Sequence, residues 1–366
     1  MRALSIFLLT FVYLVVNGQN YSDSLSHQEV YEGRIGVSEE DFPVLYWAGS
    51  AVSIKFTGTE LGVSLDDEKG DNFFQVIIDG YEEFPILIDC EKGAKYYQLV
   101  HGLPEGTHIA KLTKRTEPWE GSTIFKGFKV NGEIKPMPVN TDKKLKIEFY
   151  GNSITSGMGN EDLSDYGRQN GNPRFKNHYL SYASIASRKL DAEHRSISLS
   201  GIGILVSWDA YIMPEIYNRT NPFDETSKWD FTQWTPDIVV INLFQNDSWL
   251  VEKPEHEQFK KRFNGIKPDA KTIIKAHLEF VKSIRKEYPN AEIICSLGSM
   301  DATREGSAWP GYVEESVKKL QKKGDEKLHM LFFPHNGHPA HPTVFHDFDM
   351  ADQLVEFIKN EILNNK

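Results

Sequence analysis

The hydrophobic pattern of this 366-residue chain changes its period once, and the change divides the chain into two halves. From about Arg34 to Val130, short runs such as "SAVSIKFTG" and "ELGVSLDD" alternate apolar and polar residues, and Gly, Pro, Asp or Asn bounds each run. Val52, Ile54 and Phe56 share one face of the first of these runs. Many short strands with regular turn signals predict an antiparallel β-sandwich or barrel, because no segment here is long enough for the crossover helices of a parallel sheet.

The second half follows a polar linker, "NGEIKPMPVNTDKK", from about Asn131 to Lys144. Strand-like runs such as "LKIEFYG", "DIVVINL" and "AEIICSLG" then alternate with helical ones. One helical run carries a single apolar stripe made of Ile273, His277, Phe280, Val281 and Ile284. This alternation predicts a parallel sheet with helices on both faces. We therefore expect a β-sandwich domain over residues 30–135 and an α/β domain over residues 145–366.

The N-terminal segment has the pattern of a secretory signal. Arg2 precedes the apolar run "ALSIFLLTFVYLVV", and small residues follow it in "VNGQ". The run is too short for a retained membrane anchor, so we predict a signal peptide over residues 1–18, cut after Gly18. We expect a secreted or periplasmic protein. The net charge of −11 and the scattered basic residues argue against nucleic acid or an anionic membrane as a partner.

The chain has two cysteines, Cys90 and Cys295, one in each predicted domain. The sequence permits a disulfide between them but favours two buried thiols that pack as small apolar side chains.

Reactive groups occur in loops that follow the predicted strands of the second half. Ser153, in "KIEFYGNSITSGMG", ends the first strand and is expected to expose both its hydroxyl and its backbone N–H, as a nucleophile requires. Gly201, in "LSGIG", lets the backbone approach a ligand, and Asn246, in "INLFQNDSW", offers an amide donor. The C-terminal stretch "HNGHPAHPTVFHDFDMADQL" brings histidines that can serve as a general base for Ser153.

These motifs carry a family resemblance. "GNSIT", "GIG", "QND" and "HPTV…HDFDMADQL" resemble the successive sequence blocks of the SGNH (GDSL-type) hydrolases. With "WAGSAVSIKFTGTEL" and "FKGFKVNG" in the first half, the chain from about residue 30 to residue 360 resembles carbohydrate esterase family 2. The resemblance implies a jelly-roll sandwich followed by a flavodoxin-like SGNH domain. It also implies removal of acetyl groups from plant-type polysaccharides.

The resemblance also implies roles for single residues. Ser153 would be the nucleophile and His341 the general base, because "HPTV" and "MADQL" match the family's last block. The backbone N–H groups of Ser153 and Gly201 and the side-chain amide of Asn246 would bind the oxyanion. No cofactor and no metal is expected.

The sequence departs from the family pattern at three places. Asn152 stands where the family usually has Asp, a position that shapes the turn. Phe244 stands where a Gly usually opens the third block, and we expect it to narrow or line the pocket. The acid expected two or three residues before the base is absent, since Pro339 and His338 occupy those places.

The missing acid leaves open which group orients the base. A backbone carbonyl can do so, which gives a Ser–His dyad based on His341. In a second register, His338 is the base and Asn336 precedes it by two residues. Asp247 and Asp347 are two further candidates for orienting the histidine. We favour His341.

Two other sets of residues have competing interpretations. Trp208, Trp249 and Trp309 lie near strand-end loops, where tryptophans either stack on sugar rings or, more often, pack in the core. Four histidines within twelve residues suggest a metal site, but neither cysteine nor well-spaced carboxylates accompany them, so we predict none. These histidines are His335, His338, His341 and His346.

The sequence thus predicts a secreted serine esterase that deacetylates a polysaccharide or oligosaccharide through Ser153 and His341. One alternative is a lipase-like or thioesterase-like SGNH hydrolase. Another is a carbohydrate-binding protein whose catalytic half has decayed. The sequence sets neither the oligomeric state nor the acetylated position.

Overall fold

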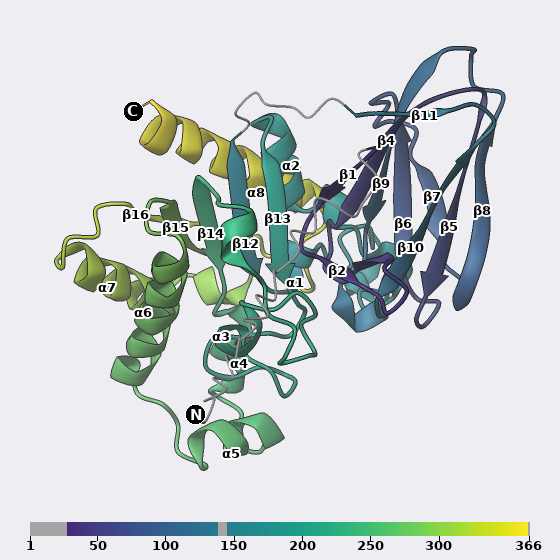
Figure 1. The fold of residues 1–366 in the computed structure, drawn as a ribbon. Coiled ribbons are helices and arrows are strands. Elements are labelled where there is room, and N and C mark those ends of the chain that lie inside the picture. Colours follow the sequence, from purple (N-terminus) through teal and green to yellow (C-terminus); the bar gives the residue numbers. More distant parts are fainter. Residues whose placement is uncertain (1–27, 138–144, 365–366) are drawn as a thin grey trace, which may run out of the picture.

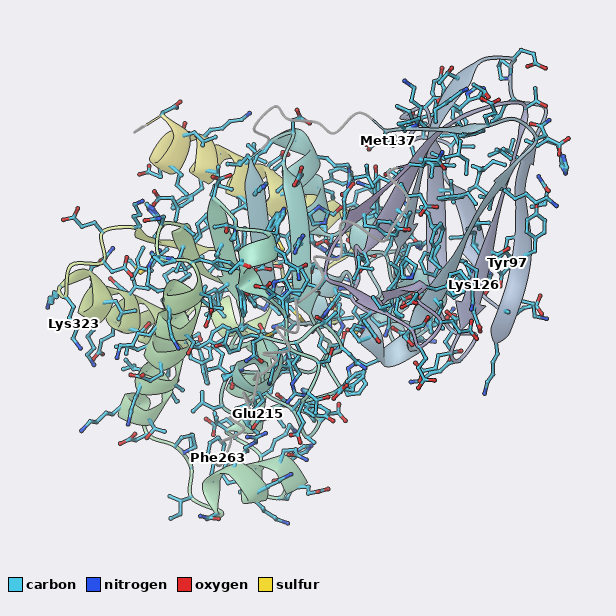
Figure 2. The ribbon with its side chains drawn as sticks, in the orientation of Figure 1. Tyr97, Lys126, Met137, Glu215, Phe263 and Lys323 are labelled. Carbon is cyan, nitrogen blue, oxygen red and sulfur yellow. The ribbon has the colours of Figure 1, made fainter. Side chains whose placement is uncertain are left out.

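The computed structural model of the protein describes residues 28–137 and 145–364. Met137 is the last described residue of the first half, which also contains Tyr97 and Lys126 (Figure 2). Lys323 lies in the second half, on the side of the molecule away from the first half. The predicted signal peptide and the end of the predicted linker lie outside the described residues. Within the described ranges, no helix has the length and apolar character needed to cross a membrane.

The first half folds into two antiparallel sheets that face each other. The first sheet has the order β1-β4-β9-β6-β7 with β11 paired to β4, and its strands are β1 (Glu29–Glu32), β4 (Ala51–Thr57), β9 (Thr107–Lys114), β6 (Phe73–Ile78), β7 (Ile86–Asp89) and β11 (Ile134–Lys135). The second has the order β2-β3-β10-β5-β8, and its strands are β2 (Ile35–Val37), β3 (Pro43–Leu45), β10 (Thr123–Val130), β5 (Glu60–Asp67) and β8 (Gly93–His101). The predicted antiparallel sandwich is therefore confirmed.

The period-two pattern explains how these sheets pack. Val52, Ile54 and Phe56 of β4 point into one core, where Leu61 and Leu65 of β5 meet them from the opposite sheet. Alternate residues of a strand point to opposite faces, so each strand contributes every second side chain to the space between the sheets. The result is one apolar core for the sandwich.

The second half contains a five-stranded parallel sheet with the order β13-β12-β14-β15-β16. Its strands are β12 (Lys146–Gly151), β13 (Glu193–Ser198), β14 (Ile238–Asn242), β15 (Glu292–Leu297) and β16 (Leu328–Phe332). The helices are α1 (Ser153–Ser156), α2 (Tyr182–Lys189), α3 (Met213–Ile216), α4 (Gln245–Leu250), α5 (Glu257–Phe263), α6 (Ala270–Glu287), α7 (Trp309–Gln321) and α8 (Val344–Phe357), which continues as a π-helix (Ile358–Leu363). This is the doubly wound order in which ligands bind beyond the carboxyl ends of the strands, where the order reverses beside β12.

Each face of the parallel sheet has its own core. Helices α2 and α8 pack on the face that holds Ile147 and Phe149, whereas α6 and α7 pack on the face that holds Tyr150. Figure 1 shows these two helix pairs on either side of the sheet and the sandwich beside the β13 edge. The predicted stripe of α6, from Ile273 to Ile284, is buried in the second of these cores.

The sandwich is joined to the parallel-sheet domain by buried contacts. The fully buried guanidinium of Arg34 donates to the Glu148 carboxylate at 3.1 Å and to the Tyr150 hydroxyl at 3.0 Å, both on β12. Trp47 is 1% exposed, and its indole N–H donates to the Thr220 carbonyl at 2.7 Å. Since unpaired buried polar groups are costly, these bonds hold the two domains in one arrangement.

Candidate active site

Ser153 lies where the structure turns from β12 into helix α1. Asn152 caps this short helix, and its side-chain oxygen accepts the Ile154 N–H at 3.0 Å. At Gly151, the last residue of β12, any Cβ would lie 2.0 Å from the Thr155 hydroxyl oxygen, so glycine is required for the helix to follow the strand directly. Ser153 is 5% exposed and begins the helix, so its backbone N–H is one of those without an acceptor within the helix.

His341 contacts Ser153 across 188 positions of sequence. Its Nε2 lies 2.9 Å from Ser153 Oγ, and its Nδ1 bonds to the side-chain oxygen of Asn170. The His341 backbone N–H also donates to that oxygen, at 3.4 Å, while Asn170 Nδ2 donates to the Gly159 carbonyl at 3.3 Å. These partners set the orientation of the Asn170 amide, so Nδ1 must carry the imidazole proton. Nε2 is then the acceptor that faces the serine hydroxyl.

Asn170 was not predicted from the sequence. It lies in a loop between α1 and α2, and the Asp162 carboxylate organises this loop by accepting the backbone N–H groups of Ser164 at 3.0 Å and Gln169 at 2.8 Å. The sequence offered a backbone carbonyl, Asn336 in the His338 register, Asp247 and Asp347 as orienting groups. An asparagine within a polar, Gly-rich loop carries no signal that distinguishes it from an ordinary turn residue.

The surroundings of His341 keep its imidazole neutral. Burial lowers the pKa of His341 from 6.5 to about 4, even though part of the side chain is open to solvent. The Glu117 carboxylate opposes this shift, whereas Lys176 and His338 add to it. A neutral acceptor, Asn170, does not stabilise the imidazolium as a carboxylate would. At neutral pH the ring therefore holds a free lone pair toward Ser153.

The alternative base, His338, does not face the serine. Its Nδ1 lies 3.0 Å from the His341 carbonyl oxygen and 3.3 Å from the Ala340 nitrogen. Asn336 accepts the His338 N–H at 2.9 Å and so shapes the backbone of this loop. The structure thus brings His341, and not His338, to Ser153.

Neither of the two aspartates considered as orienting groups contacts the histidine. Asp247 is fully buried and accepts the backbone N–H groups of residues 204–206 at 2.7 to 3.1 Å, and burial raises its pKa to about 6 despite these donors. Asp347 accepts from Asn160 Nδ2 at 3.1 Å and from the Tyr182 N–H at 3.0 Å. Both carboxylates hold loop segments in place through these bonds. The group that orients His341 is therefore the Asn170 amide, which bonds to its Nδ1.

Asn246 lies against the loop that contains Gly201. Its Nδ2 donates to the Ile202 carbonyl at 2.9 Å, and its Oδ1 accepts the indole N–H of Trp208 at 3.1 Å. Because an indole N–H only donates, this bond sets the orientation of the amide. An amide nitrogen carries two N–H groups, so the one not used by Ile202 remains for a ligand. Gly201 has φ +83°, a conformation that favours glycine.

Phe244 does not line a pocket, and that prediction is wrong. Its ring is completely buried, with its centroid 5.2 Å from that of His277 and 5.0 Å from that of Trp309. Its backbone is left-handed, with φ +82°, at the cap of α4. This conformation accounts for the glycine usual at this position. Phe244 gains core packing that offsets the backbone strain of about 1 to 3 kcal/mol.

Of the three tryptophans considered for sugar stacking, Trp208 is the most open, with 38% of its surface exposed. Trp249 and Trp309 line a pocket of about 350 Å³ that includes neither Ser153 nor His341, and the Trp249 indole N–H donates to Asp301 there at 3.1 Å.

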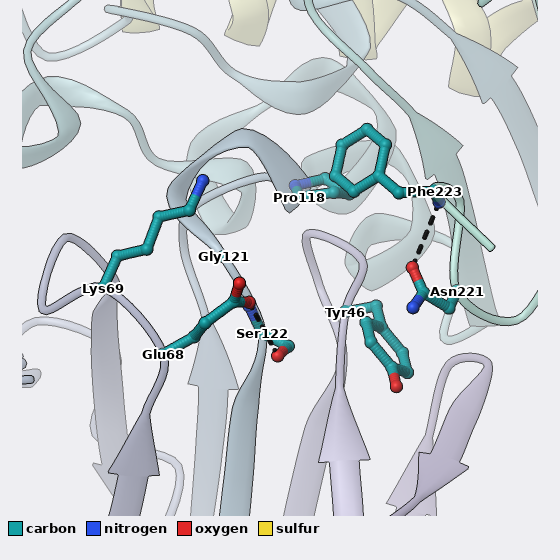
Figure 3. A pocket seen from close by; sticks show the side chains of 8 residues that line it. All are labelled: Tyr46, Glu68, Lys69, Pro118, Gly121, Ser122, Asn221 and Phe223. Atoms are coloured by element: carbon teal, nitrogen blue, oxygen red, sulfur yellow. Dashed lines mark hydrogen bonds between the residues drawn. The ribbon is translucent and has the colours of Figure 1, made fainter. Parts of the chain in front are cut away.

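A further pocket of about 310 Å³ lies between the domains, with Tyr46 and Phe223 on one side and Glu68 and Lys69 on the other (Figure 3).

Cys90 and Cys295 are buried and free, as predicted. Among the described residues, no three side chains of His, Cys, Asp or Glu gather in a way that would hold a metal ion.

Comparison with known proteins relates this arrangement to a family. A family model described as the carbohydrate esterase 2 N-terminal domain matches residues 31–139. A solved family two carbohydrate esterase from Clostridium thermocellum, in complex with cellohexaose, is 32% identical, with a TM-score of 0.77. The alignment covers 91% of this chain and 99% of that one. This chain belongs to carbohydrate esterase family 2.

Curated relatives extend the comparison of this family 2 chain. The cellulase/esterase CelE of Acetivibrio thermocellus is 33% identical over 343 residues, which are 91% of this chain, and the match spans 39% of that relative's length. An acetylxylan esterase / glucomannan deacetylase of Cellvibrio japonicus is 24% identical over 329 residues, covering 88% of this chain and 86% of the relative. The resemblance predicted from the sequence is confirmed, as are the jelly-roll and SGNH folds that it implied.

Proposed function

We propose that this family 2 chain is a secreted serine esterase that removes acetyl groups from polysaccharides or oligosaccharides. The observation that carries the proposal is the contact of 2.9 Å between Ser153 Oγ and His341 Nε2, with Asn170 on the other ring nitrogen. In a carbohydrate esterase, this arrangement supplies a nucleophile, a base and a group that orients the base. Export rests on the signal peptide predicted over residues 1–18.

The proposed reaction proceeds through an acetyl-enzyme. Ser153 Oγ attacks the acetyl carbonyl carbon while its proton passes to Nε2 of His341, and the imidazolium then protonates the departing sugar oxygen. The backbone N–H groups of Ser153 and Gly201 and the free amide N–H of Asn246 stabilise the oxyanion. Water, deprotonated by His341, hydrolyses the acetyl-enzyme and releases acetate. Asn170 holds the ring through both steps.

A sugar substrate is supported by the relatives and by the exposed ring of Trp208. The named activities of the Cellvibrio relative are acetylxylan esterase and glucomannan deacetylase, and the Clostridium structure holds cellohexaose. Trp208 donates its indole N–H to Asn246, so this partly exposed side chain lies beside the proposed oxyanion site. Aromatic faces of this kind stack on the apolar faces of sugar rings.

The test compares wild type and Ser153→Ala on 4-nitrophenyl acetate and on longer acyl esters. Acetate turnover that the substitution abolishes, with little turnover of long chains, is expected. Efficient cleavage of long chains would instead point to the lipase-like alternative. Negligible rates from both proteins would contradict an esterase and favour a binding protein. Acetate release from acetylated xylan and glucomannan then identifies the polysaccharide.

A further inference from the structure

The sandwich domain sends one buried segment into the neighbourhood of the proposed active site. This segment is Glu117 with the short 3-10 helix that follows it, Pro118–Glu120. The Glu117 side chain is completely buried. Its Oε2 accepts the backbone N–H of Ser200 at 2.5 Å and lies 3.2 Å from the hydroxyl of Ser156, while its Oε1 accepts from the Lys176 ammonium at 2.9 Å. One carboxylate thus joins the Gly201 loop to helix α1.

Trp119 holds the same loop through a second bond. Its indole N–H donates to the Ser200 carbonyl at 3.0 Å. That carbonyl and the N–H of Gly201 belong to one peptide group, which is planar and places the two bonds in opposite directions. Fixing the direction of the carbonyl therefore fixes the direction of the Gly201 N–H.

A parallel relation holds at the nucleophile. The carbonyl of Asn152 and the N–H of Ser153 also share one planar peptide group. Within helix α1 the Asn152 carbonyl accepts the Ser156 backbone N–H at 3.0 Å. The Ser156 hydroxyl lies 2.9 Å from that carbonyl and 3.2 Å from the Glu117 carboxylate, and its single proton is donated to one of the two. The Ser200–Gly201 peptide group is therefore anchored directly by Glu117 and Trp119, whereas helix α1 itself holds the Asn152–Ser153 group.

We propose that Glu117 and Trp119 of the sandwich domain are positioning residues that aim the Gly201 backbone donor of the oxyanion hole. The proposal rests on the proposed function. The sandwich would then complete the catalytic apparatus as well as bind the neighbouring domain. Donors of this kind act only when they are directed in advance at the place where charge develops, so a small rotation of the Ser200–Gly201 peptide group lowers the rate.

The charges around Glu117 keep it suited to this role. Burial alone raises the pKa of its carboxyl group, but the Lys176 ammonium and the hydrogen bonds from Ser200 outweigh burial and lower the pKa. Glu120 pairs with the same ammonium at 2.6 Å, and burial raises the pKa of Glu120. The lowered pKa keeps Glu117 ionised, and an ionised acceptor makes the stronger bonds.

The experiment compares two test variants with two matched controls. Trp119→Phe keeps one aromatic ring against Phe223 but removes the indole N–H together with part of the ring system, and Glu117→Gln removes the charge. Trp47→Phe is the control for the first, because its indole N–H also donates to a carbonyl between the domains. Glu148→Gln is the control for the second, because the buried Glu148 carboxylate also pairs with a cation between the domains, Arg34 at 3.1 Å.

Three measurements are made. Steady-state kinetics on 4-nitrophenyl acetate give kcat and KM, inhibition by an alkylboronic acid reports affinity for a tetrahedral adduct with the serine, and thermal unfolding gives the midpoint. We expect both test variants to lose about 10- to 100-fold in kcat, with KM within about twofold and boronate affinity reduced in proportion. The controls should stay within about threefold of wild type even where their thermal midpoints fall equally.

Controls that lose as much as the test variants would show a merely structural role and overturn the inference, as would a Trp119→Phe variant with unchanged kcat and boronate affinity. If Glu117→Gln fails to fold, Trp119→Phe and its control decide the question. An inactive wild type would overturn the proposed function itself, and the inference with it. An active wild type with an unaffected Trp119→Phe overturns the inference alone.

Discussion

Replacing Asn170 by aspartate is the sharpest test of how His341 works. The neutral amide oxygen of Asn170 accepts the Nδ1–H of His341. Asn170→Asp keeps the acceptor and the size of the side chain but adds a negative charge in contact with the ring. The imidazolium form then gains a partner that it lacks in the wild type.

The size of the effect follows from the present pKa of His341, which burial lowers from 6.5 to about 4. A carboxylate in contact with an ionisable cation raises its pKa by about 1 to 3 units, and each unit corresponds to about 1.4 kcal/mol. The base is active only when unprotonated, so kcat/KM falls as the pH drops through this pKa. We expect the acid limb near pH 4 in the wild type and between about pH 5 and pH 7 in Asn170→Asp.

The assay is the pH dependence of kcat/KM on 4-nitrophenyl acetate, since this quantity reports pKa values of the free enzyme. Asn172→Asp is the control, because Asn172 lies two residues away, is exposed and caps a turn by accepting the Arg174 N–H at 3.1 Å. It adds the same charge without touching His341. An acid limb at the same pH in Asn170→Asp, Asn172→Asp and wild type would refute this account of the histidine.

Three further outcomes are expected. His341→Ala should lower kcat/KM on 4-nitrophenyl acetate by about 10³-fold or more, whereas His338→Ala should leave at least a tenth of the wild-type value; the reverse order would make His338 the base. Trp208→Phe removes the N–H that orients Asn246 and should lower kcat. Trp208→Ala should in addition raise KM for an acetylated oligosaccharide but not for 4-nitrophenyl acetate. Equal effects of Trp208→Ala on the KM of both substrates would exclude a stacking role. Burial lowers the pKa of His178 to about 4, so as the pH falls the unfolded chain binds a proton at this histidine before the folded chain does. Between pH 7 and pH 5, wild type should therefore lose about 2 kcal/mol more unfolding free energy than His178→Asn, as measured by urea denaturation. Equal losses in the two proteins would contradict this.

The order of the two domains and the class of each could be predicted from the sequence, because hydrophobic period is a local property of a chain. Alternation at every second residue marks β4 and β5, and the stripe from Ile273 to Ile284 marks α6. The contact between Ser153 and His341 could also be predicted from the sequence, because the loops that follow the strands of a parallel sheet meet at one edge. Phe244 shows the limit of such reasoning, because its burial depends on α6 and α7, which lie far along the chain.

The chain's own pattern thus determined which loops carry the hydroxyl, the imidazole and the amide. The tertiary structure alone decided what surrounds them: Asn170 behind the histidine, Asp247 beneath the loop of residues 204–206, and Glu117 with Trp119 against Ser200. The physical reason is that periodicity and turn chemistry act between residues close in sequence. Hydrogen bonds between distant segments depend on how whole domains pack, and a lone asparagine or glutamate gives no local sign of its partner.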